Sequence, residues 1–386
     1  MKIGNVLNDF TMPGGEPVMA RAIAKRLGAA RFERSSSEWA DLRGTSRLVP
    51  VLRSFHNEPV LREFQAWAER EKPDVVLFHN IFPVLSPSIV QEAKNLGIRI
   101  VLYLHSYRYL CTNGFFLNHG ELCERCIHGN FWPAAATACW RDSHALSAWY
   151  GAILFTLRPR GFFQKVDQFV AVSDFVRNKY IEAGLPAKKI ATLHHFLDCS
   201  NIEPSMRDDE YILFMGRLSG EKGVMTLLEA ARMLPDIPFR IAGDGPLFDP
   251  AWKFVSEHGL KNVSLEGFVD GERKRELFAG TRLVVVPSEW NEPFGMVVLE
   301  AYAAQKPVLA SRMGGLVEIV EGGKTGDFFT ARHAQSLAEA LRRMFDEPER
   351  MRQWGRNGRA WVESHCNPMA WEREMRGILQ EVVNNS

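Results

Sequence analysis

Short apolar runs alternate with amphipathic segments along the whole chain. Runs of four to six residues such as 75–78 and 283–286 predict buried strands, and apolar residues at helical spacing follow most of them. This alternation is typical of parallel sheets covered by helices. The expected strands are 2–7, 75–78, 99–104, 168–172, 211–215, 239–242, 263–265, 283–286 and 308–310. The expected helices include 17–27, 88–96, 174–183, 224–234 and 295–304.

A polar, broken stretch at 199–209 interrupts the pattern, which then restarts. A chain of 386 residues is long enough for two domains of roughly 150 to 200 residues. The prediction is an α/β protein with two Rossmann-like, doubly wound parallel sheets, in domains 1–200 and 201–367. The helix pattern at 368–386 either returns to pack on the first domain, as we expect, or closes the second.

Composition narrows the class of protein. Apolar residues make up 46% and charged residues 24%, and no run of about 20 uncharged apolar residues predicts a membrane span. The first apolar run is too short for a signal peptide, so a cytoplasmic location is expected. Residues 1–200 hold 24 Lys and Arg against 18 Asp and Glu, and the rest holds 23 against 28. The first half is too weakly basic to predict nucleic-acid binding; it has either an ordinary solvated surface or one facing anionic lipid or an anionic acceptor.

Four of the six cysteines lie within 29 residues, with the spacing C-x11-C-x2-C-x12-C: Cys111, Cys123, Cys126 and Cys139. A CxxC turn can present two thiolates to one zinc ion. In a reducing compartment such metal binding is more common than disulfide formation. A structural zinc and ordinary reduced cysteines in a tight loop both remain open, and disulfides are the third interpretation.

Strand ends in the second half share features of an anion site. The run GRLSGEKG at 216–223 follows a strand and places Arg217 and Lys222 around a glycine turn, where both can bind a diphosphate. A second strand ends in Gly243-Asp244-Gly245 and a third in Gly267-Phe268-Val269. After 283–286, the turn at 293–295 begins a helix, whose N-terminus attracts anions.

Taken together, GRLSGEKG, AGDGP, EGFV and the E-x7-E run EPFGMVVLE resemble the retaining nucleotide-sugar glycosyltransferases of family 4, which have the GT-B architecture of two Rossmann-like domains. Pro307, Ser311, the Gly314-Gly315 pair and Glu318 extend the resemblance over nearly the whole second domain. In the first domain Gly14-Gly15-Glu16, His105 and the run AVSD at 171–174 support it. The pair His194-His195 departs from the Pro-Asn of many relatives.

The resemblance implies a role for each matching residue. Arg217 and Lys222 neutralise the donor diphosphate, Glu300 accepts hydrogen bonds from the ribose hydroxyls and Glu292 holds a donor-sugar hydroxyl. Catalytic roles are expected for Arg217, Lys222, Glu292 and His105. Donor contacts are expected at Gly14, Gly15, Gly216, Gly243, Gly245, Phe268, Val269, Phe294, Gly295, Met296 and Glu300. His79, which also follows an apolar run, either points to the same site or is a core histidine.

These expectations predict a hexosyltransferase that moves a sugar from a nucleoside diphosphate, with uridine favoured, to a saccharide or lipid-linked acceptor in polysaccharide or glycolipid synthesis. Two cations and a helix N-terminus can stabilise the leaving group, so no metal or other cofactor is expected in catalysis. No carboxylate stands out as a nucleophile, which favours retaining transfer without a covalent intermediate. A non-catalytic scaffold and a sugar-nucleotide epimerase are the alternatives; a phosphorylase would need a cofactor-binding lysine motif that the sequence does not show.

One helix pattern in the first half suggests the acceptor side. Residues 145–155 form an apolar run followed by Arg158, Arg160 and Lys165, with Phe162 and Phe163 among them. Aromatic and basic residues on a short apolar helix suit peripheral contact with the inner membrane surface, and a core helix is the alternative.

Overall fold

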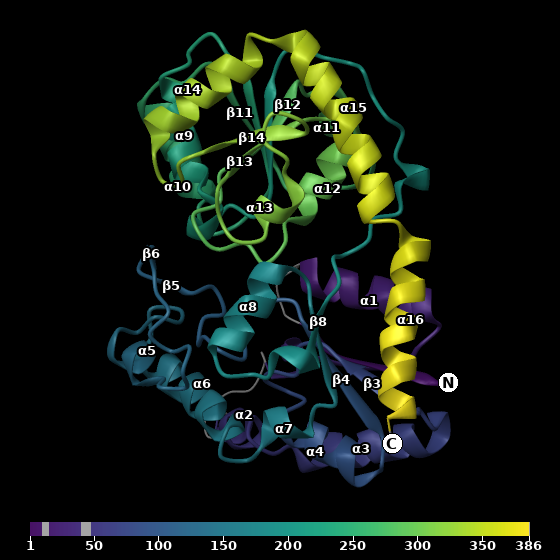
Figure 1. Cartoon of the computed structure of the whole chain (residues 1–386). Helices are drawn as coiled ribbons and strands as arrows, with labels where there is room; N and C mark the ends of the chain where they lie inside the picture. Colours follow the sequence, from purple (N-terminus) through teal and green to yellow (C-terminus); the bar gives the residue numbers. More distant parts are fainter. Residues whose placement is uncertain (10–14, 40–47, 386) are drawn as a thin grey trace. The chain divides into compact units, whose positions relative to one another are not determined.

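The computed structural model describes residues 1–9, 15–39 and 48–385, with the side chain of Leu48 excepted. The chain folds into two compact units, which are described separately (Figure 1). Unit 1 comprises Met1–His119, Cys123–Leu193 and Met369–Ser386, and unit 2 comprises Gly120–Leu122 and His194–Pro368.

Among the residues that the structure describes, unit 1 contains a six-stranded sheet with the strand order β2-β1-β3-β4-β7-β8. All neighbouring strands in it are parallel. Its strands are β1 (Ile3–Asp9), β2 (Ala30–Ser35), β3 (Val75–Phe78), β4 (Arg99–Leu104), β7 (Gln168–Ala171) and β8 (Ile190–Thr192). Two short strands pair with each other outside both six-stranded sheets: β5 (Leu117–Asn118) and β6 (Glu121–Leu122), the latter assigned to unit 2. The helices of unit 1 are α1 (Gly15–Leu27), α2 (Leu48–Arg53), α3 (Glu58–Glu71), α4 (Ser88–Asn95), α5 (Trp132–Ala136), α6 (His144–Leu157), α7 (Phe162–Lys165), α8 (Asp174–Glu182) and nearly all of α16 (Pro368–Asn384).

Unit 2 has a second parallel six-stranded sheet, in the order β11-β10-β9-β12-β13-β14. The strands are β9 (Ile212–Met215), β10 (Phe239–Ala242), β11 (Val263–Gly267), β12 (Leu283–Val286), β13 (Val308–Ser311) and β14 (Gly326–Phe329). The helices are α9 (Val224–Arg232), α10 (Phe248–Glu257), α11 (Gly271–Gly280), α12 (Met296–Ala303), α13 (Leu316–Ile319), α14 (Ala334–Phe345) and α15 (Pro348–His365).

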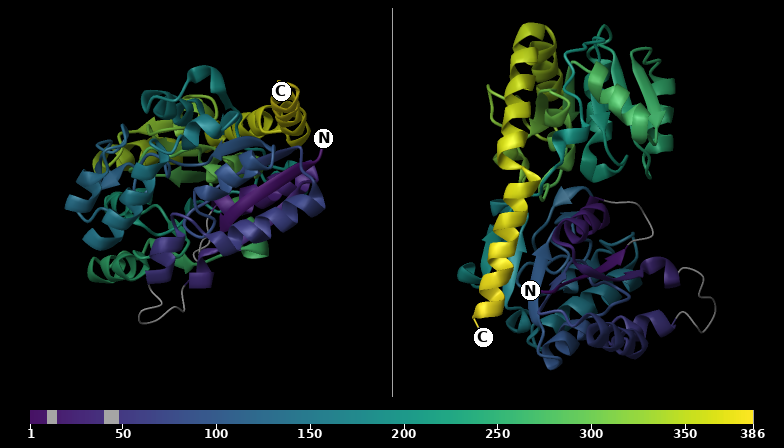
Figure 2. Two further views of the ribbon diagram at one scale, coloured as in Figure 1. Left: turned by 90° about the horizontal axis from the view of Figure 1, so that it is seen from below. Right: turned by 90° about the vertical axis from the view of Figure 1, so that its right-hand side faces the viewer.

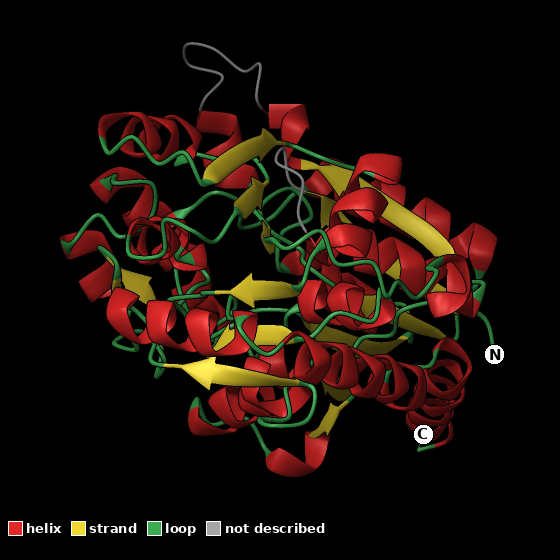
Figure 3. Cartoon of the chain, turned by 90° about the horizontal axis from the view of Figure 1, so that it is seen from above, coloured by secondary structure: helices red, strands yellow, loops and turns green. Residues whose placement is uncertain are grey.

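Burial explains why the central strands form. All four side chains of β3 and of β12 are buried, so each strand is a continuous apolar run rather than an alternating one. Each fully buried aliphatic or aromatic side chain contributes about 1.5 to 3 kcal/mol to folding. Figure 3 shows the strands among the helices that cover them. The predicted fold class, α/β with two doubly wound parallel sheets, is confirmed.

The strand order locates the ligand-binding edge of unit 2. In its sheet the chain moves outward in one direction from β9 and in the other from β12, so the order reverses between these two neighbours. Their pairing aligns Leu283 with Ile212 and Val284 with Leu213, which brings the carboxyl ends of both strands to one edge. Doubly wound proteins bind ligands at this point because the following loops diverge and leave a crevice.

The last helix, α16, belongs with unit 1 and lies along it in Figure 2. Arg26 of α1 forms an ion pair with Glu372 at 3.0 Å, and Arg376 donates to the carbonyl of Leu27 at 3.0 Å. Trp371, Met375 and Leu379 are buried on its inner face. Among the described helices, none is long and apolar enough to cross a membrane.

Candidate active site

The turn after β9 carries Arg217 and Lys222 at the point where the sheet order reverses. Arg217 Nε donates to Ser219 Oγ at 3.1 Å, and its Nη2 donates to Glu221 Oε1, which Ser219 Oγ also reaches at 2.7 Å. Burial alone would raise the pKa of Glu221, but the charge of Arg217 and the hydrogen bonds from Ser219 and Arg217 outweigh it and lower that pKa. Glu221 therefore stays ionised and orients the guanidinium, whose side chain is 35% exposed.

Lys222 meets Glu292 across the edge of the sheet. Its Nζ donates to Glu292 Oε1, and the Ser288 hydroxyl donates to the same oxygen at 2.8 Å. Lys222 Nζ also lies 5.3 Å from the centre of the Trp290 ring. The Glu292 side chain is only 7% exposed, so Lys222 and Ser288 replace the hydrogen bonds that water would otherwise give it. The structure thus brings together two residues that the sequence places 70 positions apart.

Two glycines of the predicted set are required by close backbone contacts. Gly243 has a φ of 143°, and a Cβ there would lie 1.8 Å from the carbonyl oxygen of Gly216. A Cβ on Gly314 would lie 2.3 Å from the carbonyl oxygen of Glu292. These contacts hold the β9 and β12 turns against their neighbours, so larger residues would displace the loops that carry Lys222 and Glu292.

The N-terminus of α12 lies directly after the Glu292 turn. Its N-cap residue Gly295 adopts a φ of 110°, and Met296 is the first residue of the helix. Gly295 has no side chain to cap the first helical amides, which makes them available to an anion. Phe294, which is buried, contacts the rings of His194 and His195 at centroid distances of 5.2 and 5.3 Å. Burial, followed by the nearby His194, lowers the pKa of His195 to about 3, so this ring stays neutral.

Glu300 lies one turn into α12 with a cation beside it. Lys274 of α11 donates through Nζ to Glu300 Oε1 at 2.6 Å, and the Glu300 side chain is 26% exposed. The carboxylate is therefore oriented by Lys274 and remains accessible to a ligand. Glu300 and Glu292 lie on α12 and on the turn before it, as their spacing predicts.

The third strand end forms an exposed aromatic edge. Gly267 ends β11 with a φ of 69°, and Phe268 is 68% exposed, while Val269 is half-buried. Glu266 is held by Arg240 at 3.1 Å and Arg273 at 2.7 Å. An exposed aromatic ring beside a fixed strand end can stack on a planar base.

Unit 1 places His105 in a buried hydrogen-bonded chain after β4. His105 Nε2 lies 2.7 Å from His79 Nδ1, and His79 Nε2 lies 2.8 Å from Asn5 Oδ1. The Tyr103 ring stacks on His105 with a centroid distance of 4.5 Å. The rotamer and tautomer of His105 are therefore coupled to His79 and Asn5. Gly15 begins α1, whereas Gly14 lies outside the described residues.

The four clustered cysteines lie in unit 1 between β4 and α6. Cys111, Cys123 and Cys126 precede α5, and Cys139 lies between α5 and α6. Cys111-Thr112-Asn113-Gly114 and Cys126-Ile127-His128-Gly129 make two similar turns, in which the glycine amide donates to the cysteine carbonyl at 3.0 and 2.9 Å. No group of three or more His, Cys, Asp and Glu side chains in the described ranges is arranged to hold a metal ion. The zinc stays a prediction that rests on cysteine spacing.

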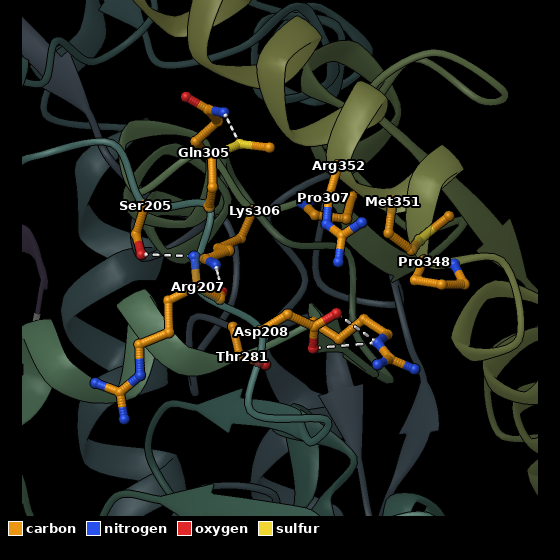
Figure 4. A pocket seen from close by; sticks show the side chains of 12 residues that line it. Ser205, Arg207, Asp208, Thr281, Gln305, Lys306, Pro307, Pro348, Met351 and Arg352 are labelled. Atoms are coloured by element: carbon orange, nitrogen blue, oxygen red, sulfur yellow. Dashed lines mark hydrogen bonds and ion pairs between the residues drawn. The ribbon is translucent and has the colours of Figure 1, made fainter.

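A separate pocket of unit 2 lies at the opposite edge of the sheet, before β9, β12 and β13 begin (Figure 4). Lys306 donates there to the carbonyl of Arg207 at 2.6 Å, and Arg282 binds Asp208 at 2.9 Å. Each of its charged side chains already has a partner within the protein, and the pocket lies away from the carboxyl ends of the strands. The candidate donor site is therefore the β9–β12 edge and not this pocket.

Comparison with known proteins agrees with the two-sheet architecture. Residues 200–361 match the model for glycosyl transferases group 1, and residues 22–201 match that for glycosyltransferase family 4. The chain belongs to the family 4 glycosyltransferases. Together the two models span most of this glycosyltransferase, including both sheets except β1.

Among curated relatives, the glycosyltransferase is 26% identical over 300 residues to the alpha-D-kanosaminyltransferase of Streptomyces kanamyceticus, covering 75% of this chain and 72% of that protein. It is 28% identical over 229 residues to the uncharacterized glycosyltransferase MJ1178 of Methanocaldococcus jannaschii, covering 58% of this chain and 62% of that protein. It is 26% identical over 278 residues to an uncharacterized 42.6 kDa protein in the cps region of Klebsiella pneumoniae, covering 71% of this chain and 66% of that protein. The last two matches span less than two thirds of those relatives.

Solved structures share the fold of the glycosyltransferase. Anabaena HepE in complex with UDP-glucose has a TM-score of 0.70 at 19% identity and covers 99% of this chain and 100% of that one. The sucrose-phosphate synthase of Thermosynechococcus elongatus has a TM-score of 0.74 at 18% identity, with both chains fully covered. At these identities the likeness establishes the GT-B fold alone.

The sequence alone does not reveal four side chains that position the candidate residues: Ser288, Glu221, Lys274 and Asn5. Ser288 and Glu221 lie within a few residues of Glu292 and Arg217, and their polar character inside otherwise apolar or glycine-rich turns is the only sequence indication. Lys274 lies on a polar helix without any distinguishing pattern.

Proposed function

We propose that the chain transfers a hexose from a uridine diphosphate sugar to a hydroxyl of a saccharide or lipid-linked acceptor, in polysaccharide or glycolipid synthesis. The observation that carries this proposal is the convergence of Arg217, Lys222 and the N-terminus of α12 at the reversal point of the unit 2 sheet. Two fixed cations and free helical amides form a binding site for a diphosphate.

The uridine assignment draws on neighbours of the same fold. HepE is described in complexes with UDP and with UDP-glucose. In this chain the exposed Phe268 edge would contact the base and Glu300 would accept hydrogen bonds from the ribose. The 2.6 Å contact with Lys274 supports this role, because it orients the Glu300 carboxylate while leaving it partly exposed.

In the proposed reaction the bond between the sugar C1 and the β-phosphate oxygen breaks, and its electron pair stays on the phosphate. Arg217, Lys222 and the α12 amides stabilise that charge, which fills the role that a divalent cation has in other transferases. The acceptor oxygen bonds to C1 on the same face, and its proton passes to the departing phosphate oxygen. Glu292 holds a sugar hydroxyl, and a catalytic role for His105 of unit 1 is part of the proposal.

The test is turnover of a panel of nucleotide sugars, with release of the nucleoside diphosphate measured in excess chelator. We expect release of UDP from one UDP-hexose. NMR of the product should show an α-linkage when the donor is α-linked, as retaining transfer requires. A free, altered sugar nucleotide would indicate an epimerase instead. No turnover with any donor, including slow hydrolysis, would contradict the proposal.

A further inference from the structure

Helix α6 of unit 1 exposes an apolar face. Its inner side buries Tyr150, Ile153, Leu154 and Leu157. The residues exposed on the outer side are His144 in the first turn and the apolar residues Ala145, Ala148, Ala152 and Phe155, which follow one another at intervals of three or four and therefore share a face. A surface helix ordinarily carries Asp, Glu, Lys or Arg on its solvent side, and the exposed side of α6 between 144 and 155 has none of these four.

Helices α2 and α5 extend the same surface. On one edge of the face, Trp149 Nε1 donates to Ser54 Oγ, just after α2, at 3.0 Å. On the other edge, a Cβ on Gly151 would lie 3.1 Å from Cβ of Phe131, which is followed by Trp132. Figure 1 shows α2, α5 and α6 in one part of unit 1. We call this surface the α6 face; it comprises Val49, Val51, Leu52, Trp132, Ala145, Ala148, Ala152 and Phe155.

The side chains of the α6 face are unusually accessible. Leu52 is 72% exposed, Trp132 74% and Phe155 61%. Single exposed apolar side chains are normal, but a group on three adjacent helices marks an interaction surface. Phe131 and Leu154, which precede Trp132 and Phe155, are buried, and Ser143 caps α6 by accepting from the Leu146 amide at 3.3 Å. The exposed side chains therefore belong to well-formed helices.

Cations border this surface and acidic residues are scarce. Between 127 and 165 the sequence has one acidic residue, Asp142. Arg53 at the end of α2, Arg141 before α6 and Arg160 after it are exposed. Arg158, in contrast, donates inward to the carbonyl of Ala183 at 2.6 Å and serves the fold.

We propose that the α6 face binds the surface of an anionic lipid bilayer. Aromatic and aliphatic side chains that enter the headgroup region, with arginines at the border, are the features of an interfacial helix. The arginines at the border favour an anionic bilayer over other partners, because each arginine near an anionic lipid surface raises the affinity about fivefold. Membrane binding is measured without a sugar nucleotide, so it stands or falls separately from the proposed reaction.

The experiment is sedimentation of the full chain with lipid vesicles. The protein is expected to bind vesicles containing about one-third anionic lipid, to bind neutral vesicles more weakly, and to lose much of its binding at high salt. The double variant Trp132→Ser/Phe155→Ser should lose at least tenfold in partitioning. Trp252→Ser is the matched control, because Trp252 is also 61% exposed but lies on α10 of unit 2.

Circular dichroism and thermal unfolding check that all variants fold. Arg141→Ser and Arg160→Ser should each weaken binding to anionic vesicles about fivefold and leave binding to neutral vesicles unchanged. Failure of the wild type to bind anionic vesicles, or equal loss in Trp252→Ser, would overturn the proposal. Dimerisation that disappears in Phe155→Ser, without lipid binding, would also overturn it and assign the surface to a protein contact.

Discussion

Lys222 Nζ donates to Oε1 of Glu292, and the Ser288 hydroxyl donates to the same oxygen at 2.8 Å. A residue that we assign to the diphosphate and a residue that we assign to the sugar are thus paired before any donor binds. The pair holds the lysine at the edge of the sheet, and it costs little to rearrange because a phosphate can replace the carboxylate as the partner of the ammonium group.

Glu292→Gln should separate sugar recognition from nucleotide binding. The neutral amide is expected to lower kcat/KM for the donor sugar about 100-fold, while the Kd for UDP stays equal or falls because Lys222 loses a competing anion. Calorimetry and donor turnover measure the two effects. Glu257→Gln on α10, where the carboxylate side chain is 58% exposed, is the control. Loss of UDP binding in Glu292→Gln would contradict the assignment.

Glu300→Ala should weaken UDP binding about tenfold or more, because hydrogen bonds to a charged group contribute about 1.5 to 3 kcal/mol each. The sharper measurement compares UDP with its 2′,3′-dideoxy analogue. The wild type should prefer UDP, and Glu300→Ala should bind both nearly equally. Lys274→Met removes the 2.6 Å contact but keeps the carboxylate, so it should retain most of the preference. An undiminished preference in Glu300→Ala would remove Glu300 from the ribose site.

His79→Phe should lower turnover by about tenfold to 100-fold through the position of His105, whose Nε2 lies 2.7 Å from His79 Nδ1. The variant cannot hold the His105 ring in one tautomer. His79→Gln, which can still hydrogen bond, should recover part of the rate, and its pH profile should lie closer to that of the wild type. The control is His56→Phe, where the histidine side chain is 58% exposed. Equal rates in the Phe and Gln variants would leave His79 a purely structural role.

Lys306 should make unit 2 more stable as the pH rises. Burial lowers the pKa of Lys306 from 10.5 to about 8, against the smaller opposing effects of Asp208 and Asp209. Between these values the unfolded chain binds more protons than the folded one, so stability increases with pH by up to about 3 kcal/mol from this group. Urea unfolding at pH 7 and near pH 10 should show the increase in the wild type and a smaller one in Lys306→Met. Lys324→Met, with a 73% exposed lysine, should behave as the wild type. Parallel pH dependence of Lys306→Met and the wild type would contradict this prediction.

Sequence patterns predict the interior of both sheets and one of the four edge strands, β11, and miss the other three edges. The runs 75–78, 99–104, 239–242 and 283–286 coincide with β3, β4, β10 and β12, because strands buried on both faces are continuous apolar runs. The unpredicted strands β2, β8 and β14 all lie at sheet edges. β2 reads ARFERS, whose charges suit an edge that faces water and conceal the strand from a search for apolar runs.

The candidate site is predictable where glycines and charges lie close together in the sequence. The run from Gly216 to Gly223 contains both cations and the turn that presents them. Contacts such as Lys274 with Glu300 join residues 26 positions apart on different helices, and only the packing of α11 beside α12 brings them together. The contact of His79 with Asn5 is likewise hidden, because Asn5 lies on a separate strand.

Calorimetry of UDP binding tests the central claim most directly. The purified protein is titrated with UDP, GDP, ADP and CDP after treatment with a chelator, and the titrations are repeated with Lys222→Ala and with Lys253→Ala, whose lysine side chain is 71% exposed on α10. The account predicts micromolar binding of UDP without metal, reduced at least 100-fold in Lys222→Ala and unchanged in Lys253→Ala. Equal binding by Lys222→Ala, or no binding of any nucleotide, would contradict a donor site at the β9–β12 edge.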